Sequence, residues 1–115
     1  MTKQFKVTEK ETAAQVGSGT LPVLATPVLA AWIEGIATEI ASSLHSTEES
    51  SVGTNINLDH LKKSKVGETI TCQVNLIEQD RRKLVFSAVC LNEAGEQIAT
   101  ASHTRFIINI AKFLS

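Results

Sequence analysis

The sequence has no excess of charge of either sign. It carries 11 basic and 12 acidic residues among 115, for a net charge of -1, and they are scattered along the chain. Nucleic acid binding depends on a basic patch or stripe, so nucleic acid is not expected as a main partner. Because 43% of the residues are hydrophobic, the chain can bury a core without cross-links, and we expect one domain over residues 1–115.

Cysteine is scarce as well. Cys72 and Cys90 are the only two, both lie in apolar stretches, and neither belongs to a CxxC motif or to a Cys/His cluster with metal-ligand spacing. We therefore expect no metal and no cofactor, and we expect two buried, reduced thiols. Reduced thiols are typical of a reducing compartment, so the expected location is cytoplasmic.

The chain also lacks a long uncharged hydrophobic run. Its most apolar stretch, residues 21–44, contains Glu34 and Glu39, whereas a membrane span needs about 20 nearly uncharged residues. Residues 1–10 alternate polar and charged side chains and have no apolar stretch of the kind that a secretory signal needs. We expect a buried helix in the apolar stretch, no membrane partner, and no export by that route.

What the sequence does contain is a clear succession of strand and helix patterns. Apolar periodicity predicts one strand, one long helix and then four strands, over residues 4–12, 26 to 44 or 45, 52–60, 68–78, 83–91 and 97–110. Turn residues predict a loop at 17–22 and hairpin turns at 79–82 and 93–96.

This order of elements predicts an α+β fold in which a curved antiparallel sheet of about five strands wraps around one long central helix. The helix is expected to begin at Thr26-Pro27, because the threonine hydroxyl can accept a backbone N–H and proline has none to lose. Residues 83–91 are apolar on both faces, as in a strand covered on two sides, which suggests pairing with a second copy.

Glu34 is the first residue that a purely structural interpretation explains poorly. It lies mid-helix among apolar neighbours such as Trp32 and Ile33, and a carboxylate held out of water is costly unless it is paired or protonated. The structural alternative is a narrow polar stripe of Glu34, Thr38 and Ser42, spaced by four, that faces solvent or a partner.

His60 and Thr26 are the other two candidate functional residues. Alternation predicts that one face of the strand carries Val52, Thr54, Ile56, Leu58 and His60, so the imidazole is expected to point toward the helix. A hydrogen-bonded core histidine is the structural alternative. For Thr26 capping is a sufficient explanation, although a helix N-terminus could also stabilise an oxyanion during acyl transfer.

These residues belong to a larger pattern. Leu24-Ala25-Thr26-Pro27 followed by Glu34, and Ser51-Val52-Gly53-Thr54 leading to His60, resemble the fluoroacetyl-CoA thioesterase family of hot-dog-fold thioesterases. The spacing of Thr, Glu and His matches the three catalytic positions of that family. Ser102-His103-Thr104-Arg105-Phe106 is similar to a His-x-Arg segment common there, so the resemblance extends from the helix start to the final strand.

The resemblance implies a hydrolase of the hot-dog fold that cleaves a short or small acyl-CoA to free acid and CoA. It implies that Thr26, Glu34 and His60 are catalytic and that Gly53 and Thr54 contact the substrate. Glu34 would attack the thioester carbonyl or activate a water, and His60 would orient the attacking group or pass a proton. Thr26 would hold the glutamate or the oxyanion.

The helix geometry adds a constraint to this site. Eight helical residues separate Thr26 from Glu34 by about 12 Å along the axis, so the two side chains can hardly touch. Side chains that lean toward the N-terminus, and a Thr26 placed in the entry loop, would shorten the gap. The alternative, which we take as our hypothesis, is that a second subunit supplies one catalytic residue, which predicts a homodimer, or a higher oligomer, with its active site at the interface.

Substrate selectivity and CoA contacts follow less directly. In the namesake enzyme of the family that this chain resembles, aromatic side chains just upstream of the threonine gate the pocket. Gly17–Leu21 contains no aromatic residue. This difference predicts a more open pocket for a different small acyl group. Lys62 and Lys63, with Lys65, and the hairpin residues 81–83 are candidates for the CoA phosphates. Charged loops that only aid solubility are the alternative.

Other interpretations remain open. His103 and Arg105 share a face of the last strand, where Arg105 pairs with an acidic group or contacts a ligand. A non-catalytic hot-dog module that binds an acyl thioester or a protein partner would use the same fold. A hydratase or dehydratase would need a close Asp/His pair, and Asp59 and His60, as strand neighbours, face opposite sides.

Overall fold

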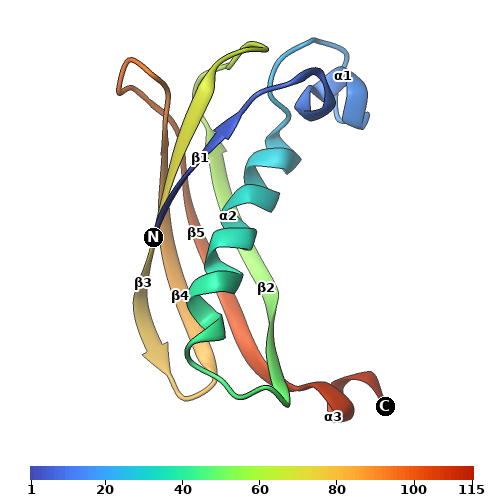
Figure 1. The fold of residues 1–115 in the computed structure, drawn as a ribbon, viewed down its shortest axis with the longest axis vertical. Helices are drawn as coiled ribbons and strands as arrows, with labels where there is room; N and C mark the ends of the chain where they lie inside the picture. Colours follow the sequence, from blue (N-terminus) through green and yellow to red (C-terminus); the bar gives the residue numbers. More distant parts are fainter.

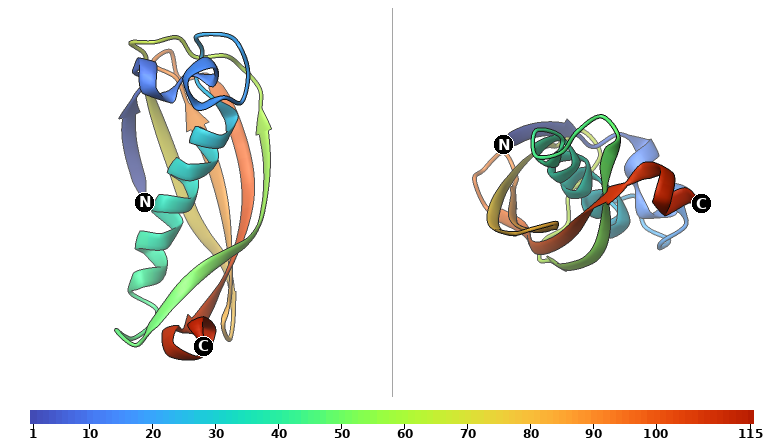
Figure 2. Two further views of the ribbon diagram at one scale, coloured as in Figure 1. Left: turned by 90° about the vertical axis from the view of Figure 1, so that its right-hand side faces the viewer. Right: turned by 90° about the horizontal axis from the view of Figure 1, so that it is seen from below.

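The computed structural model describes residues 1–115 and confirms the α+β class: a curved five-stranded antiparallel sheet wraps around helix α2 (Figure 1). The view from below in Figure 2 shows α2 lying in the hollow of the sheet. The elements in chain order are β1 (Thr2–Lys6), the 3-10 turn η1 (Glu9–Glu11), α1 (Ala13–Val16), α2 (Thr26–Ser42), β2 (Glu49–His60), β3 (Thr69–Asp80), β4 (Lys83–Leu91), β5 (Gln97–Asn109) and α3 (Ile110–Leu114).

The sheet has the strand order β1-β3-β4-β5-β2. Two hairpins join its middle strands: β3 and β4 meet at Asp80–Lys83, where Arg81 adopts a positive φ of 58°, and β4 and β5 meet at a loop with Gly95 at φ 80°. Both turns lie where the sequence predicts them. Since β2 closes the order at one side, it pairs with β5 only and leaves one edge free.

Helix α2 is held by one apolar stripe. Its buried residues recur every three or four positions and are Leu29, Ile33, Ile36, Ala37 and Ala41. They pack in a cluster of 17 buried residues with inward side chains of the sheet, among them Ile70, Phe86 and Ile98. Each buried Leu, Ile or Phe side chain contributes about 1.5–3 kcal/mol, so this stripe fixes the orientation of the helix and of its polar face.

The start of α2 differs from the prediction. Ala25 occupies the N-cap position and makes no side-chain capping bond, while Thr26 is the first helical residue and Pro27 follows it. The prediction that the Thr26 hydroxyl caps the helix is therefore wrong. Proline in the first turn still favours the helix, because the N–H it lacks would have had no partner there, and the hydroxyl is left available to another element.

The alternation along β2 also differs from the prediction. A bulge at Thr54, between the pairs Gly53–Arg105 and Asn55–Thr104, inserts one extra residue. Ser51 and Gly53 therefore face the helix on one side of the bulge, and Ile56, Leu58 and His60 do so on the other. Val52 and Thr54 are turned to the outer face, so the prediction of a single inward face from Val52 to His60 holds only for its second half.

Two other strands differ from expectation in detail. The first strand ends at Lys6, and the segment that follows folds into η1, which Thr8 and Glu11 close with a capping box. In β4 the inward residues are buried, but Val85 and Val89 on the outer face are only half-buried, so the outer face is uncovered in one chain. None of the helices is long and apolar enough to cross a lipid bilayer.

The two cysteines face each other across β3 and β4. Cys72 pairs with Cys90 in the register, both are fully buried, and their sulfurs lie 3.2 Å apart as free thiols. The Cys90 thiol and burial together raise the pKa of the Cys72 thiol. The pair fills space in the core opposite α2, as predicted for buried thiols.

Candidate active site

The end of β2 meets the start of α2 in a direct side-chain contact. Thr26 Oγ1 lies 2.8 Å from Nδ1 of His60, which is the last residue of β2. The other ring nitrogen of His60, Nε2, is shielded from solvent and has no hydrogen-bond partner. A buried polar atom without a partner is rare and costly, so Nε2 is a place where a bound molecule can form a hydrogen bond.

A pocket opens beside this pair. It has a volume of about 310 Å³ and is lined by Thr26, His60 and Pro27 together with the segment that follows β2 and residues near α1; the further lining residues are Ala13, Ser18, Val23, Leu24, Leu61, Lys62 and Lys63. No aromatic side chain lines it. The site therefore combines a threonine–histidine pair, an apolar floor and two ammonium groups.

The environment of His60 favours a neutral ring. Burial lowers the pKa of His60 below its ordinary value of 6.5, and the backbone of Lys62 acts in the opposite direction to a smaller extent. A neutral imidazole has one donor and one acceptor nitrogen. Near neutral pH, His60 can thus accept a proton or donate a hydrogen bond through Nε2 while Thr26 holds Nδ1.

Glu34 lies in a second polar cluster, further along α2. Its carboxylate pairs with the guanidinium of Arg105 at 3.6 Å, and its side chain is 42% exposed in this chain. It makes no direct contact with His60. The expectation of a carboxylate held out of water beside His60 is therefore wrong for a single chain, where Glu34 is half-exposed and the nearby imidazole is that of His103.

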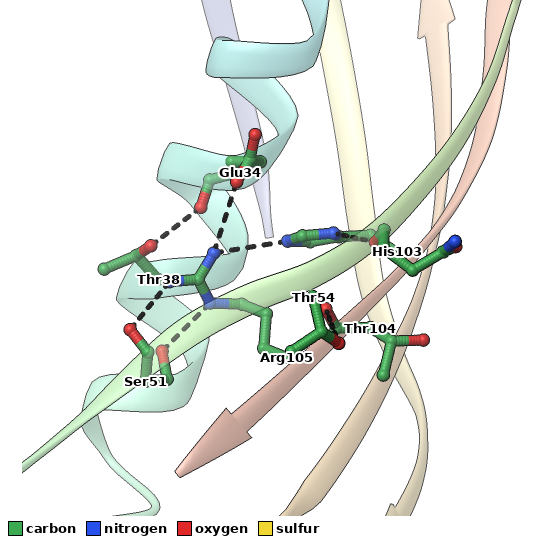
Figure 3. A network of polar contacts seen from close by, with 8 residues as sticks. Glu34, Thr38, Ser51, Thr54, His103, Thr104 and Arg105 are labelled. Atoms are coloured by element: carbon green, nitrogen blue, oxygen red, sulfur yellow. Dashed lines mark hydrogen bonds and ion pairs between the residues drawn. The ribbon is translucent and has the colours of Figure 1, made fainter. Parts of the chain in front are cut away.

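Arg105 is the centre of this second cluster (Figure 3). Its Nε donates to Ser51 Oγ at 2.9 Å, its Nη2 donates to the Ser51 carbonyl at 2.9 Å, and its Nη1 lies 3.2 Å from His103 Nε2. His103 Nδ1 donates to the carbonyl of Asn55 at 2.7 Å, which leaves Nε2 as the acceptor for Arg105. The cluster satisfies nearly every polar group it contains.

Burial dominates the electrostatics of this cluster. It lowers the pKa of Arg105, which the charge of Glu34 partly offsets, and a guanidinium still remains charged at any physiological pH. Burial also lowers the pKa of His103, the Asn55 carbonyl raises it, and the Arg105 charge lowers it further. A neutral His103 and a charged Arg105 explain how two nearly buried side chains lie side by side without repulsion.

Gly53 is the point at which this cluster touches β2. A Cβ at this position would lie 2.8 Å from Glu34 Oε2, 3.1 Å from His103 Cε1 and 3.2 Å from Arg105 Nη1. These distances are shorter than normal contacts, so only glycine leaves room for the three side chains. Beside it, Thr54 turns to the outer face and donates to the carbonyl of Thr104 at 3.3 Å.

The basic residues fall into two groups at opposite ends of the sheet. His60, next to Lys62 and Lys63, pairs with Ala99 near the start of β5, whereas Lys83 pairs with Phe106 near its end. Lys62 also forms an ion pair with Glu96, and Arg82 forms one with Glu49. Only the lysines past β2 line the pocket that contains Thr26 and His60.

The structure thus brings Thr26 and His60 together and keeps Glu34 with Arg105 and His103. The sequence interpretation correctly placed His103 and Arg105 on one face, and of its two alternatives for Arg105, an acidic partner or a ligand, the structure shows the acidic partner Glu34. It missed Ser51, the main acceptor for the guanidinium. The signal was Gly53, because a glycine inside a strand often marks a bulge, and the bulge is what turns Ser51 inward.

Comparison with known proteins decides the family. A family model described as FlK, fluoroacetyl-CoA-specific thioesterase, matches residues 7–111. The chain belongs to the FlK family. No match was found among curated proteins. The match spans the pocket, both polar clusters and strands β2 to β5, whereas β1 lies before it.

Solved structures agree on the hot-dog fold. A mutant of FlK in complex with fluoroacetate and CoA is 22% identical, with a TM-score of 0.90, and the alignment covers 99% of this chain and 93% of that chain. A hypothetical protein from Thermus thermophilus, described as a thioesterase superfamily member, is 19% identical over 98% and 83% of the two chains, with a TM-score of 0.90. The protein smu.793 from Streptococcus mutans, bound to acetyl CoA, is 17% identical over 94% and 80%, with a TM-score of 0.79.

Proposed function

We propose that this protein is an acyl-CoA thioesterase that hydrolyses a short acyl-CoA to the free acid and CoA. The observation that carries the proposal is the Thr26–His60 pair at 2.8 Å, whose residues line a pocket with Lys62 and Lys63, while the buried Nε2 of His60 has no partner. Membership of the FlK family agrees with it. The pocket lacks aromatic residues, which favours a small acyl group other than fluoroacetyl.

The chemistry needs one base, one proton donor and a place for negative charge. Water adds to the thioester carbonyl and loses a proton to a carboxylate, the tetrahedral intermediate collapses, and the CoA thiolate leaves and takes up a proton. We assign the base to Glu34 and the proton transfer at the pocket to His60 Nε2. Thr26 holds the imidazole through Nδ1, and the N-terminus of α2 supplies N–H groups for the oxyanion.

We further propose that Glu34 reaches His60 from a second copy of the chain. Within one chain the two side chains belong to different clusters, and Glu34 is eight residues further along α2 than Thr26, about 12 Å along the axis. β2 has a free edge of 12 residues, which is a template for pairing with another strand. An antiparallel β2–β2 pair would form one sheet across the two copies.

The bulge restricts the register of such a pair. Residues that face each other across antiparallel strands point to the same side, so inward residues must meet inward residues. A two-fold axis at Asn57 meets this condition when the bulge residue Thr54 is left without a partner: Ile56 then faces Leu58 of the other copy, and His60 faces its Gly53. Since Glu34 lies against Gly53, this register would bring the Glu34 carboxylate of one copy toward the His60 imidazole of the other.

The lysines past β2 suit the rest of the substrate. Lys62 and Lys63 line the pocket, and Lys65 lies close behind them on the surface. Ammonium groups at the pocket mouth would meet the CoA phosphates. Thr54 faces the outer side of the sheet, and the proposed site does not use it.

A thiol-release assay over a panel of short acyl-CoA esters tests the function. Wild-type protein should release CoA from at least one ester, and Glu34→Gln should abolish release without unfolding the protein. The control is Glu39→Gln, a surface glutamate of the same helix, which should keep wild-type rates. If the Glu34 variant is as active as the wild type, the assigned base is wrong.

A second candidate is a non-catalytic module that binds acyl thioesters. It is favoured by the Arg105–Glu34 ion pair, which holds the carboxylate away from His60 within the chain. Binding of the esters by wild-type protein with no release of CoA from any of them would establish this candidate over the enzyme.

We also propose that the protein is one domain and that it acts in the cytoplasm. The proposed location rests on the two thiols, which lie 3.2 Å apart without a disulfide bond.

Cysteine cross-linking tests the pairing of the two copies. Asn57 is exposed on β2, and a cysteine there would face its own copy across the proposed axis. Asn57→Cys should form a covalent dimer on mild oxidation, whereas Asp59→Cys, which would face position 55, should not. A reversed result would exclude the proposed register.

A further inference from the structure

The short helix α3 exposes apolar side chains at one end of the sheet. Phe113 is 55% exposed and Leu114 is 77% exposed, and with Ile110 they border an apolar groove of about 280 Å³ over Val52 and Ile108 on the outer face. Exposed apolar side chains grouped in this way mark a contact surface more often than scattered ones do.

α3 is fastened in a defined position. The backbone N–H of Ile110 donates to the Glu48 carbonyl at 3.1 Å, and the Asn109 side chain caps the helix at the N–H of Lys112 at 3.0 Å. Figure 1 shows α3 projecting beyond the free edge of β2, at the end of that strand remote from α1. A chain that pairs with β2 and extends to this end of the strand would therefore approach α3.

The opposite end of β2 carries a matching surface. Leu61 follows His60, lines the pocket and is 56% exposed, and Val16 and Leu21 are exposed in the neighbouring segment. Lys65, at this end, is exposed and forms no ion pair. Glu48, at the α3 end, is also exposed and forms no ion pair. One end of β2 thus combines apolar side chains with a free carboxylate, and the other combines them with a free ammonium.

An antiparallel pair joins these two ends. With the axis at Asn57 and the bulge residue Thr54 left without a partner, Val52 of one copy faces Leu61 of the other. Glu48, which precedes β2, and Lys65, which follows the bend at Lys62, then lie at the same end of the pair. The contact occurs twice, once on each side of the axis. Both the apolar surfaces and the charges are complementary in this register.

We propose that α3 of one copy packs against Leu61 of the second copy and so completes the wall of that copy's active-site pocket. The inference rests on the β2 pairing of the proposed function, and it adds a positioning residue, Phe113, that acts through Leu61. Covered by Phe113, Leu61 is held beside His60 and narrows the space for the acyl group. The family match ends at residue 111, so Phe113 belongs to a part of the chain outside it.

A pair of cysteines tests the contact. Leu61→Cys combined with Phe113→Cys should give a covalent dimer on oxidation, whereas each single variant and the pair Ile77→Cys with Phe113→Cys should not, because Ile77 is exposed on β3, away from β2. Cross-linking through Asn57→Cys without cross-linking between positions 61 and 113 would overturn this inference and leave the proposed pairing intact. Absence of both cross-links would overturn the two together.

Charge exchange and kinetics give independent measures. Glu48→Lys and Lys65→Glu should each weaken the dimer in sedimentation experiments, and the double variant should restore it.

Phe113→Ala should raise KM for the preferred ester several-fold and relax selectivity toward longer acyl groups, while kcat changes little. Phe113→Leu should recover most of the loss. A double charge variant no tighter than the singles, or an unchanged acyl profile in Phe113→Ala, would contradict the contact.

Discussion

The two polar clusters around α2 differ in how completely their groups are satisfied. In the cluster of Arg105, the guanidinium, the His103 ring and Ser51 saturate one another, and the side chain of Arg105 is only 7% exposed. In the cluster of Thr26 and His60, both residues line a pocket, and a shielded imidazole nitrogen has no partner. A saturated network fixes geometry, whereas an unsatisfied atom leaves a hydrogen bond that the proposed substrate can form.

The largest effect is expected at the unsatisfied cluster. His60→Ala removes the group to which we assign proton transfer, so kcat/KM should fall by about 100- to 10,000-fold. The free energy of unfolding should change little, because His60 is only partly buried. His45→Ala, at a half-buried histidine that does not line the pocket, is the matched control and should leave both quantities unchanged. Equal activity of the two variants would remove His60 from the site.

The saturated cluster should show the opposite pattern. Arg105→Leu leaves the His103 acceptor and the Ser51 carbonyl without a donor, so unfolding in urea should require about 3 kcal/mol less. Arg82→Leu breaks an exposed ion pair with Glu49 and should cost less than about 1 kcal/mol. If both substitutions cost the same, the buried network is not the stabilising element we describe.

A substitution at Gly53 should lower both the stability and the activity of the protein. In Gly53→Ala the new methyl group must displace the flexible Glu34 carboxylate and press on the nearly buried His103 and Arg105, at a cost of about 1–3 kcal/mol. Activity should fall as well, because Glu34 moves. Gly35→Ala on α2 meets nothing within 4 Å and should stabilise the protein by about 0.5–1 kcal/mol. A Gly53 variant that unfolds like the wild type and keeps full activity would show that the close approach is unimportant.

A lower pH should destabilise both clusters through their histidines, by less than the substitutions above do. The pKa values of His60 and His103 lie below the ordinary 6.5, so both rings are neutral above that pH in the folded chain. The unfolded chain then binds protons first, and stability that is complete above pH 6.5 should be lost as the pH falls through the lowered pKa values. Unfolding free energies from pH 8 to pH 5 measure the loss, and His103→Gln should reduce it. A stability that rises on acidification would contradict the assigned neutral rings.

The fold could be predicted from the sequence because apolar periodicity lies within each helix or strand and does not depend on its partners. The stripe of Leu29, Ile33 and Ile36 predicts α2, and alternation predicts the meander of β3, β4 and β5. It failed at β2, where the bulge at Thr54 reverses the alternation. A bulge depends on how two strands pair, which periodicity within one strand does not record.

The candidate site shows the same division between local and long-range information. Thr26 and His60 were identified as candidates, but the hydrogen bond between them joins residues 34 positions apart and appears only in the fold. Glu34 was expected to be buried because its sequence neighbours are apolar. Its half-exposed position is instead set by packing against Gly53 and Arg105, residues far away in the sequence, which no local pattern describes.

Mixing two inactive variants shows whether His60 of one copy works with Glu34 of another. Co-expression of His60→Ala and Glu34→Gln chains gives hybrid dimers in half of the population, and each hybrid has one site with both native residues. We predict recovery of about one quarter of the wild-type activity in the mixture. A mixture as inactive as its parents, while the Asn57→Cys cross-link still forms, would show that the two residues do not act across the interface.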